Sequence, residues 1–161
     1  MATHIEDDGD AEAVWYFGFG SNMKTSVIRS RGIQPLDVKA VKVPSYVLTF
    51  DVFGLPYSEP AMASIARYTT DDENDQRGAG PPDVHGIAYL LSSADVRRLI
   101  GSEGGGVAYN EVIVAGVSLH GDDIPISMCT LTARYPRRPN AAPSARYLVC
   151  VSIFFSDQNP D

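Results

Sequence analysis

The chain has 161 residues, a length that suits a single domain with its own hydrophobic core. Its hydrophobic content of 44% and charged content of 20% are those of an ordinary soluble globular protein. The net charge of -7 argues against nucleic acid as a partner, and no apolar run reaches the length of a membrane span. The N-terminus lacks the basic and apolar regions of a secretory signal, so we expect a cytoplasmic protein with a small-molecule substrate.

Two cysteines and three histidines give no sign of redox or metal chemistry. Cys129 and Cys150 fit reduced, buried thiols better than a disulfide framework. The histidines show no spacing typical of metal ligands, and His85, on an apolar strand, fits a hydrogen-bonded core residue. We therefore expect a site without a metal or a cofactor.

The N-terminal part predicts a strand that turns directly into a helix. Residues 1–12 are acidic, and we expect them to form a disordered tail. Residues 14–19 are rich in aromatic side chains, which favours a buried strand. Glycine, serine and asparagine at positions 20–22 favour a tight turn, and a short helix is expected over 22–31. Free N–H groups at such a junction attract a carboxylate, or an oxyanion that forms on a carbonyl.

Most of the remaining chain predicts strands. The stretches with alternating and β-branched residues are 38–52 with a break at Pro44, 61–69, 84–91, 112–119 and 124–135, the last two paired as a hairpin. Residues 71–83 are charged and then rich in glycine and proline, which predicts a surface loop. A capping sequence at 92–95 begins a predicted helix that ends at Gly101 and leaves Glu103 in the loop just beyond it.

This order of elements predicts an α+β fold. Strands dominate and their connections are mostly short, so we expect a barrel or rolled sheet. The expected domain covers residues 13–148. Residues 149–161 begin with an apolar run that needs burial in the domain or in a partner, and a homodimer through this segment is one way to bury it.

Short motifs in a fixed order resemble the gamma-glutamylcyclotransferase-like family, whose signature is an N-terminal Tyr-Gly-Ser-Asn loop and a catalytic glutamate downstream. The motifs are Gly20-Ser21-Asn22, Gly54-Leu55-Pro56, the stretch 59–65, Val84-His85-Gly86, Glu103-Gly104 and the stretch 143–147. Together they cover residues 14–148. The resemblance implies a compact mixed β-barrel flanked by short helices, with the active site at the barrel mouth.

The resemblance also implies roles for particular residues. Glu103 matches the catalytic glutamate, and a carboxylate beside apolar side chains is suited to proton transfer near neutral pH. Gly20, Ser21 and Asn22 would bind the substrate's carboxylate or oxyanion. Tyr109 and Tyr147 match tyrosines that line the family's pocket, and Phe19 stands in the substrate-binding loop.

Three departures from the family pattern concern the substrate more than the fold. Phe19 stands where the family has tyrosine, so a hydroxyl is missing. Tyr16 is expected on the opposite face of the strand, where it would not replace that hydroxyl. Ser64 changes one polar group near the pocket, and residues 149–161 are more apolar than the family's closing segment.

Three functions remain open on the sequence. The first is release of 5-oxoproline from a gamma-glutamyl amine or peptide such as glutathione, with Glu103 as general acid and base. The second is a natural-product tailoring enzyme that uses Glu103 for a cyclisation or elimination on a non-glutamyl substrate, because some fungal members act in secondary metabolism. The third is a binding protein that kept the fold without catalysis.

Overall fold

The computed structural model describes residues 12–55, 59–68, 81–121, 123–145 and 147–148. The expected acidic tail up to residue 11, most of the expected loop at 71–83, and the segment 149–161 with Cys150 lie outside these residues. The predicted domain bounds therefore stay a prediction. Within the described part of the chain, no helix has the length and apolar character needed to cross a membrane.

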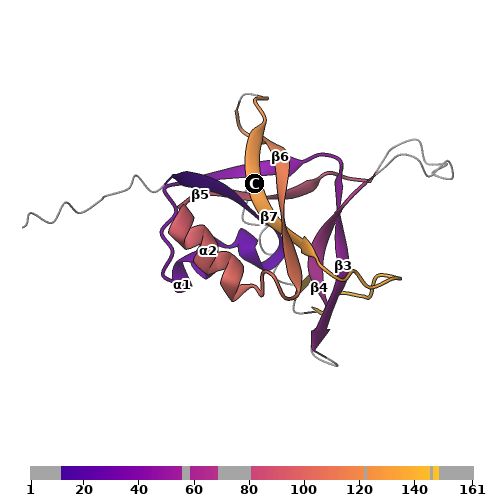
Figure 1. Cartoon of the computed structure of the whole chain (residues 1–161). Helices are drawn as coiled ribbons and strands as arrows, with labels where there is room; N and C mark the ends of the chain where they lie inside the picture. The colour runs from indigo at the N-terminus through magenta and orange to yellow at the C-terminus, as the bar shows by residue number, and fades with distance from the viewer. Residues whose placement is uncertain (1–11, 56–58, 69–80, 122, 146, 149–161) are drawn as a thin grey trace, which may run out of the picture.

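Five strands close into a barrel in the order β1, β5, β2, β6, β7 (Figure 1). They are β1 (Ala13–Gly18), β2 (Asp37–Val43), β5 (Val84–Ser92), β6 (Tyr109–Ser118) and β7 (Ile126–Ala133). Neighbouring strands are antiparallel, except that β1 closes the barrel against β7 as a parallel pair. The predicted α+β class and mixed barrel are confirmed.

Strands β3 (Tyr46–Leu55) and β4 (Glu59–Arg67) form a separate two-stranded sheet. The predicted break at Pro44 is confirmed, because the chain turns between β2 and β3. Two hydroxyl groups join this sheet to β7. The Ser64 hydroxyl accepts a hydrogen bond from the N–H of Ala133 at 2.7 Å, and the Thr132 hydroxyl donates to the carbonyl of Ile65 at 2.6 Å.

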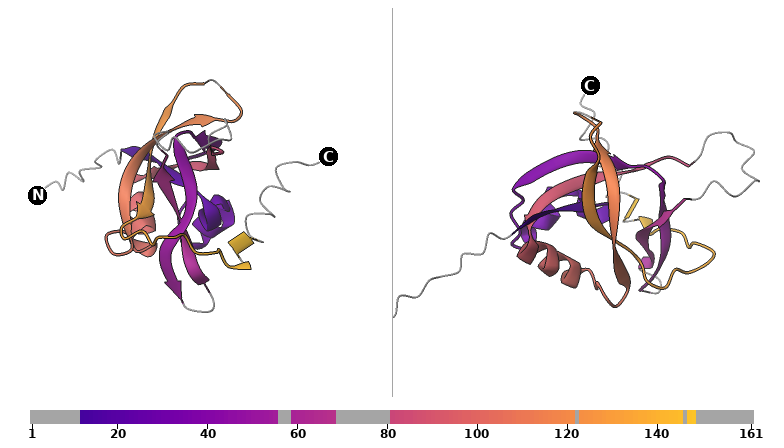
Figure 2. Two further views of the ribbon diagram at one scale, coloured as in Figure 1. Left: turned by 90° about the vertical axis from the view of Figure 1, so that its right-hand side faces the viewer. Right: turned by 45° about the horizontal axis from the view of Figure 1, so that its top comes forward.

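The helical elements before β6 are η1 (Gly20–Met23), a 3-10 turn, α1 (Thr25–Ser30) and α2 (Ser93–Ser102). Helices α1 and α2 lie on the side of the barrel away from β3 and β4 (Figures 1 and 2), whereas η1 borders a hollow together with Val47 and Leu48 of β3. The predicted helix over 22–31 is thus a 3-10 turn followed by a short α-helix. The predicted cap of α2 is confirmed, since the Ser92 hydroxyl accepts from the N–H of Asp95 at 3.2 Å.

The second half of β1 is buried on both faces, which fits the apolar run of its sequence. Successive side chains of a strand point to opposite faces. Tyr16 packs in a cluster with α1 and α2, through residues such as Ile28 and Leu99. Phe17 packs in a second cluster with Val41 and Val114 from other barrel strands. The helices are therefore fixed against one face of the strand that leads into the Gly20–Met23 turn.

Candidate active site

Glu103 is held at the end of α2 by a well-defined C-cap. Its N–H donates to the carbonyls of Leu99 and Ile100 at 3.1 and 3.2 Å. Gly104 follows with a φ of +77°, a left-handed conformation that glycine adopts without strain. The N–H groups of Gly104 and Gly105 then return to the carbonyls of Gly101 and Ile100, which completes a Schellman motif. The position of Glu103 is thus fixed by local sequence.

Tyr89 of β5 holds the Gly20–Met23 turn in place. The Tyr89 hydroxyl lies 3.0 Å from the carbonyls of both Asn22 and Met23. Burial raises the pKa of this hydroxyl to about 12, so it stays protonated and acts as a donor. Within the turn, the N–H of Asn22 donates to the carbonyl of Phe19 at 3.3 Å. This bond leaves Gly20 and Ser21 as the better candidates for backbone donors to a substrate.

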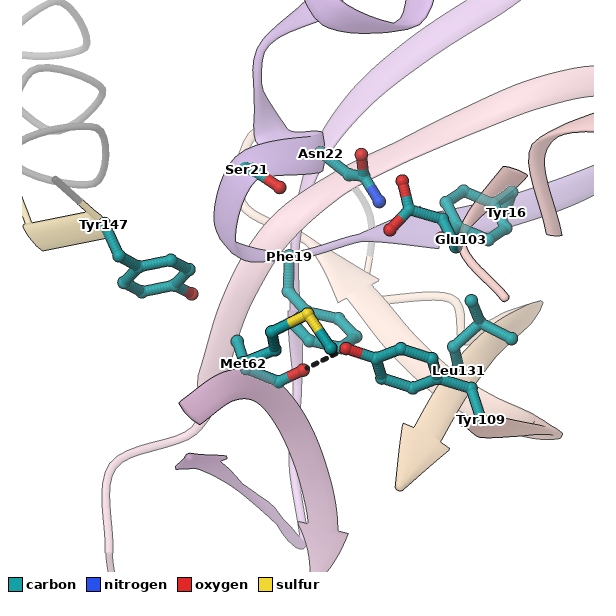
Figure 3. A pocket seen from close by; sticks show the side chains of 10 residues that line it. Tyr16, Phe19, Ser21, Asn22, Met62, Glu103, Tyr109, Leu131 and Tyr147 are labelled. Atoms are coloured by element: carbon teal, nitrogen blue, oxygen red, sulfur yellow. Dashed lines mark hydrogen bonds between the residues drawn. The ribbon is translucent and has the colours of Figure 1, made fainter. Parts of the chain in front are cut away.

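Glu103 and the turn share one cavity of about 260 Å³, and the Glu103 carboxylate points toward Asn22 (Figure 3). The residues that line the cavity are Tyr16, Phe19, Ser21, Asn22, Met62, Ala63, Glu103, Tyr109, Leu131 and Tyr147. The structure thus brings Glu103 to the Gly-Ser-Asn loop, as the sequence predicted. Gly20 is not among these ten residues, but it lies directly against the Tyr147 hydroxyl.

The expectation that Tyr16 points away from Phe19 is wrong, because both side chains line the cavity. Strand β1 ends at Gly18, so the alternation of side chains does not extend to Phe19. Burial, and then the charge of Glu103, raise the pKa of the Tyr16 hydroxyl, whereas a side-chain hydrogen bond with Asn22 lowers it. Tyr16 therefore contributes a neutral hydroxyl on the side of the cavity that holds Glu103 and Asn22.

Asn22 carries an acceptor without a partner in the described structure. Its side-chain oxygen is buried and accepts no hydrogen bond there, and the residue as a whole is 7% exposed. A buried amide oxygen left unpaired is costly, so a donor from a ligand would satisfy it. Figure 3 shows the amide group of Asn22 next to Glu103, with its nitrogen rather than this oxygen on the side of the carboxylate.

The two predicted tyrosines enter the cavity from different elements. Tyr109, the first residue of β6, donates from its hydroxyl to the carbonyl of Ala63 at 3.2 Å. Burial, and then the charge of Glu103, raise the pKa of Tyr109 above its ordinary value, so it remains a donor. Tyr147 follows the segment after β7, and its ring meets Phe50 edge-on at 5.2 Å between centroids. Phe19 and Tyr147 also border a second hollow of about 390 Å³.

The sequence missed Arg31, which forms an ion pair with Glu103. No local pattern links the two, because Arg31 follows α1 and Glu103 follows α2. Glu103 thus lies beside apolar side chains of the cavity, as expected, and also beside a cation that was not expected.

Three other expectations have mixed outcomes. The placement of His85 in the core is wrong, because its side chain is exposed at the start of β5 and contacts the carbonyl of Asp83. Cys129 is a free, buried cysteine, as predicted. Ser64 does not line the cavity, since its hydroxyl bonds to β7. Among the described residues, no group of three histidine, cysteine, aspartate or glutamate residues is placed to hold a metal ion.

Comparison with known proteins gives clear relatives, although no family model matches the chain. The chain is 49% identical over 158 residues to the gamma-glutamyl cyclotransferase gliK of Aspergillus fumigatus, covering 91% of this chain and 58% of that protein. It is 43% identical over 154 residues to the gamma-glutamyl cyclotransferase verK of Clonostachys rogersoniana, covering 86% and 83%. The chain thus spans little more than half the length of the Aspergillus fumigatus relative.

Solved structures share the fold. A gamma-glutamyl cyclotransferase superposes with a TM-score of 0.68 at 17% identity, covering 91% of this chain and 80% of that one. A yeast gamma-glutamyl cyclotransferase specific to glutathione superposes with a TM-score of 0.64 at 11% identity, covering 92% and 89%. Given this fold and the identity over most of the length of verK, the chain belongs to the gamma-glutamyl cyclotransferase family.

Proposed function

We propose that this chain converts a gamma-glutamyl amide into 5-oxoproline and a free amine, with Glu103 as general acid and base. The observation that carries the proposal is the shared cavity, in which the Glu103 carboxylate points toward the Gly20–Met23 turn (Figure 3). The family of the chain supports the same reaction.

The proposed reaction is intramolecular. Glu103 removes a proton from the substrate's α-ammonium group, and the resulting amine nitrogen attacks the side-chain carbonyl carbon to form the new ring bond. The carbonyl oxygen carries negative charge until the original amide bond breaks. Glu103 then returns the proton to the leaving amine nitrogen. The ring nitrogen still carries one proton more than the neutral lactam, and this proton passes to the departing amine, which leaves as an ammonium ion. Both reacting groups belong to one molecule, so holding the substrate folded supplies much of the acceleration, and no step needs a metal or a cofactor.

The cavity offers a matching group for each part of a glutamyl substrate. The Asn22 side-chain oxygen, buried and unpartnered within the described structure, would accept a hydrogen bond from a donor group of the substrate. The N–H groups of Gly20 and Ser21 would donate to the carboxylate or to the developing oxyanion. Phe19 would pack against the methylene carbons, because it lines the cavity without a polar atom.

A second function is supported by the apolar part of the same cavity. Phe19, Met62 and Leu131 line it beside the polar groups. Such a wall also suits a larger apolar substrate, for which Glu103 would serve as acid and base in a natural-product tailoring step.

The test is release of 5-oxoproline from glutathione, gamma-glutamyl-alanine and gamma-glutamyl-lysine by the wild type, E103Q and E111Q. Glu111 is an exposed glutamate of β6, so E111Q makes the same chemical change outside the cavity. We expect E103Q to lose activity by about 10²-fold or more, the usual worth of a positioned acid–base group, and E111Q to keep it. A folded wild type that releases no 5-oxoproline would favour the tailoring function, or a binding role if no turnover is found at all.

A further inference from the structure

Arg31 contacts the candidate catalytic carboxylate from outside the cavity. Its guanidinium forms an ion pair with the Oε1 atom of Glu103 and donates to the hydroxyl of Ser102 at 3.1 Å. The side chains of Arg31 and Glu103 are 28% and 22% exposed, so the pair is largely covered. Arg31 is not among the residues that line the cavity. The guanidinium therefore binds the carboxylate without occupying the space for a substrate.

The backbone at Arg31 is as well defined as that at Glu103. Arg31 is the C-cap of α1; its N–H donates to the carbonyl of Ile28 at 3.2 Å, and the N–H of Gly32 donates to the carbonyl of Arg29 at 2.9 Å. Gly32 follows with a φ of +74° and ends the helix. The ends of α1 and α2 thus meet where the ion pair forms, and each end is fixed by its own cap. Because the two capped helix ends lie together, a cation is held beside a carboxylate of the cavity.

We propose that Arg31 is a positioning residue for Glu103, which holds the carboxylate aimed into the cavity. The proposal rests on the proposed function for its effect on turnover. A free glutamate side chain samples several rotamers, and a base that is displaced by about 1 Å loses much of its rate. The other titratable groups that face Glu103 are Tyr16 and Tyr109, both neutral hydroxyls.

A purely structural role makes a different prediction, and Arg98 provides the matched control. Arg98 lies on α2, donates to the carbonyl of Gly32 at 3.4 Å and pairs with Asp95 at 3.4 Å. It therefore also links α2 to the end of α1, but it does not touch Glu103. If Arg31 only docks the two helices, R31M and R98M will behave alike.

The experiment measures kcat and KM for the wild type, R31K, R31M and R98M. We expect R31M to lose about tenfold or more in kcat, with a smaller change in KM, because a displaced base slows the chemical step more than it weakens binding. R31K keeps the charge and should recover part of the loss, whereas R98M should match the wild type. Values of kcat and KM for R31M equal to those of R98M would overturn the proposal.

A readout that does not need turnover separates this proposal from the proposed function. The sequence has six glutamates, Glu6, Glu12, Glu59, Glu73, Glu103 and Glu111, so carboxyl-labelled glutamate gives six carbon resonances in NMR. The resonance missing from E103Q belongs to Glu103. We expect its chemical shift at neutral pH to change in R31M but not in R98M, because only Arg31 contacts the carboxylate. If the chemical shift changes and no 5-oxoproline forms, the ion pair stands and the proposed reaction fails; if the chemical shift does not change, Arg31 does not hold the carboxylate and the proposal is wrong.

Discussion

Gly20 is the residue of the loop whose backbone most restricts substitution. Its φ is +60°, and a Cβ atom there would collide with the Tyr147 hydroxyl. We expect G20A to cost about 1–2 kcal/mol of stability, from the left-handed conformation alone. It should also lower the kcat/KM for 5-oxoproline release, because Tyr147 must leave its place in the cavity. Urea unfolding and turnover measure the two effects.

Gly101 gives the matched control for this substitution. It lies in the last turn of α2, and a Cβ there would meet nothing within 4 Å. G101A should therefore stabilise the protein by about 0.5–1 kcal/mol and leave turnover unchanged, since alanine favours a helix more than glycine does. A G20A variant with the stability and turnover of the wild type would show that Tyr147 does not need its present position.

The candidate site was predictable from sequence where one segment determines it. The N-cap of α2 and the glycines that follow Glu103 fix the position of this residue, and both features are visible in the sequence. Arg31 could not be found this way, because its contact with Glu103 depends on how two helix ends meet in space. Tyr16 was assigned to the wrong face because the sequence does not show that β1 ends at Gly18. Contacts across elements, rather than local propensity, account for these misses.

At the scale of elements, an ion pair between a buried carboxylate and a half-exposed arginine fixes the segment that leads to Tyr147. Asp51 lies at the bulge of β3 and is 1% exposed. Its carboxylate accepts from the Thr49 hydroxyl at 3.0 Å and pairs with Arg138 at 2.8 Å. The backbone N–H of Arg137 donates to the Asp51 carbonyl at 2.7 Å. The segment after β7 is thus tied to β3 before it reaches the cavity.

The ion pair predicts different effects for two neighbouring arginines. R138M leaves the Asp51 carboxylate buried with a single side-chain donor, so we expect a loss of about 1.5–3 kcal/mol and a higher KM. In R137M the backbone bond remains, and the side chain loses a contact with the exposed ring of Phe53, worth about 0.5–1 kcal/mol. Chemical denaturation of both variants tests this order. Equal losses would mean that the buried carboxylate does not depend on Arg138.

At the scale of the whole molecule, the sequence predicted the barrel but not which strands form the barrel and which form a separate sheet. The alternating stretches and the break at Pro44 gave the strand positions. The separation of β3 and β4 into their own sheet depends on long-range contacts, such as the hydrogen bond between Ser64 and Ala133. The closing parallel pair of β1 and β7 joins Tyr16 to Cys129, residues far apart in the sequence. Pairings of this kind have no local signature.

Several buried side chains keep their protons to higher pH in the folded protein than in the unfolded chain, so the stability of the fold decreases at alkaline pH. Burial, and then the charge of Glu111, raise the pKa of the Cys129 thiol from its ordinary 9.0 to about 11. Burial raises the pKa of Tyr89 from 10.0 to about 12. Below pH 9 the folded and unfolded chains both keep these protons. Above pH 9 the unfolded chain releases the thiol proton first, so it is favoured, and the stability of the fold falls.

The thiol contribution can be isolated with C129A. Alanine removes the Cys129 proton equilibrium, while the tyrosines and lysines of the two proteins titrate alike and cancel in the difference. We therefore expect the stability advantage of the wild type over C129A to shrink by about 1 kcal/mol between pH 8 and pH 10, and by about 2 kcal/mol by pH 11. Urea unfolding in reducing buffer at these three pH values measures it. An advantage that stays constant would mean that the thiol of Cys129 ionises as easily in the fold as in the unfolded chain. Water would then reach the buried cluster that contains both Cys129 and Tyr16.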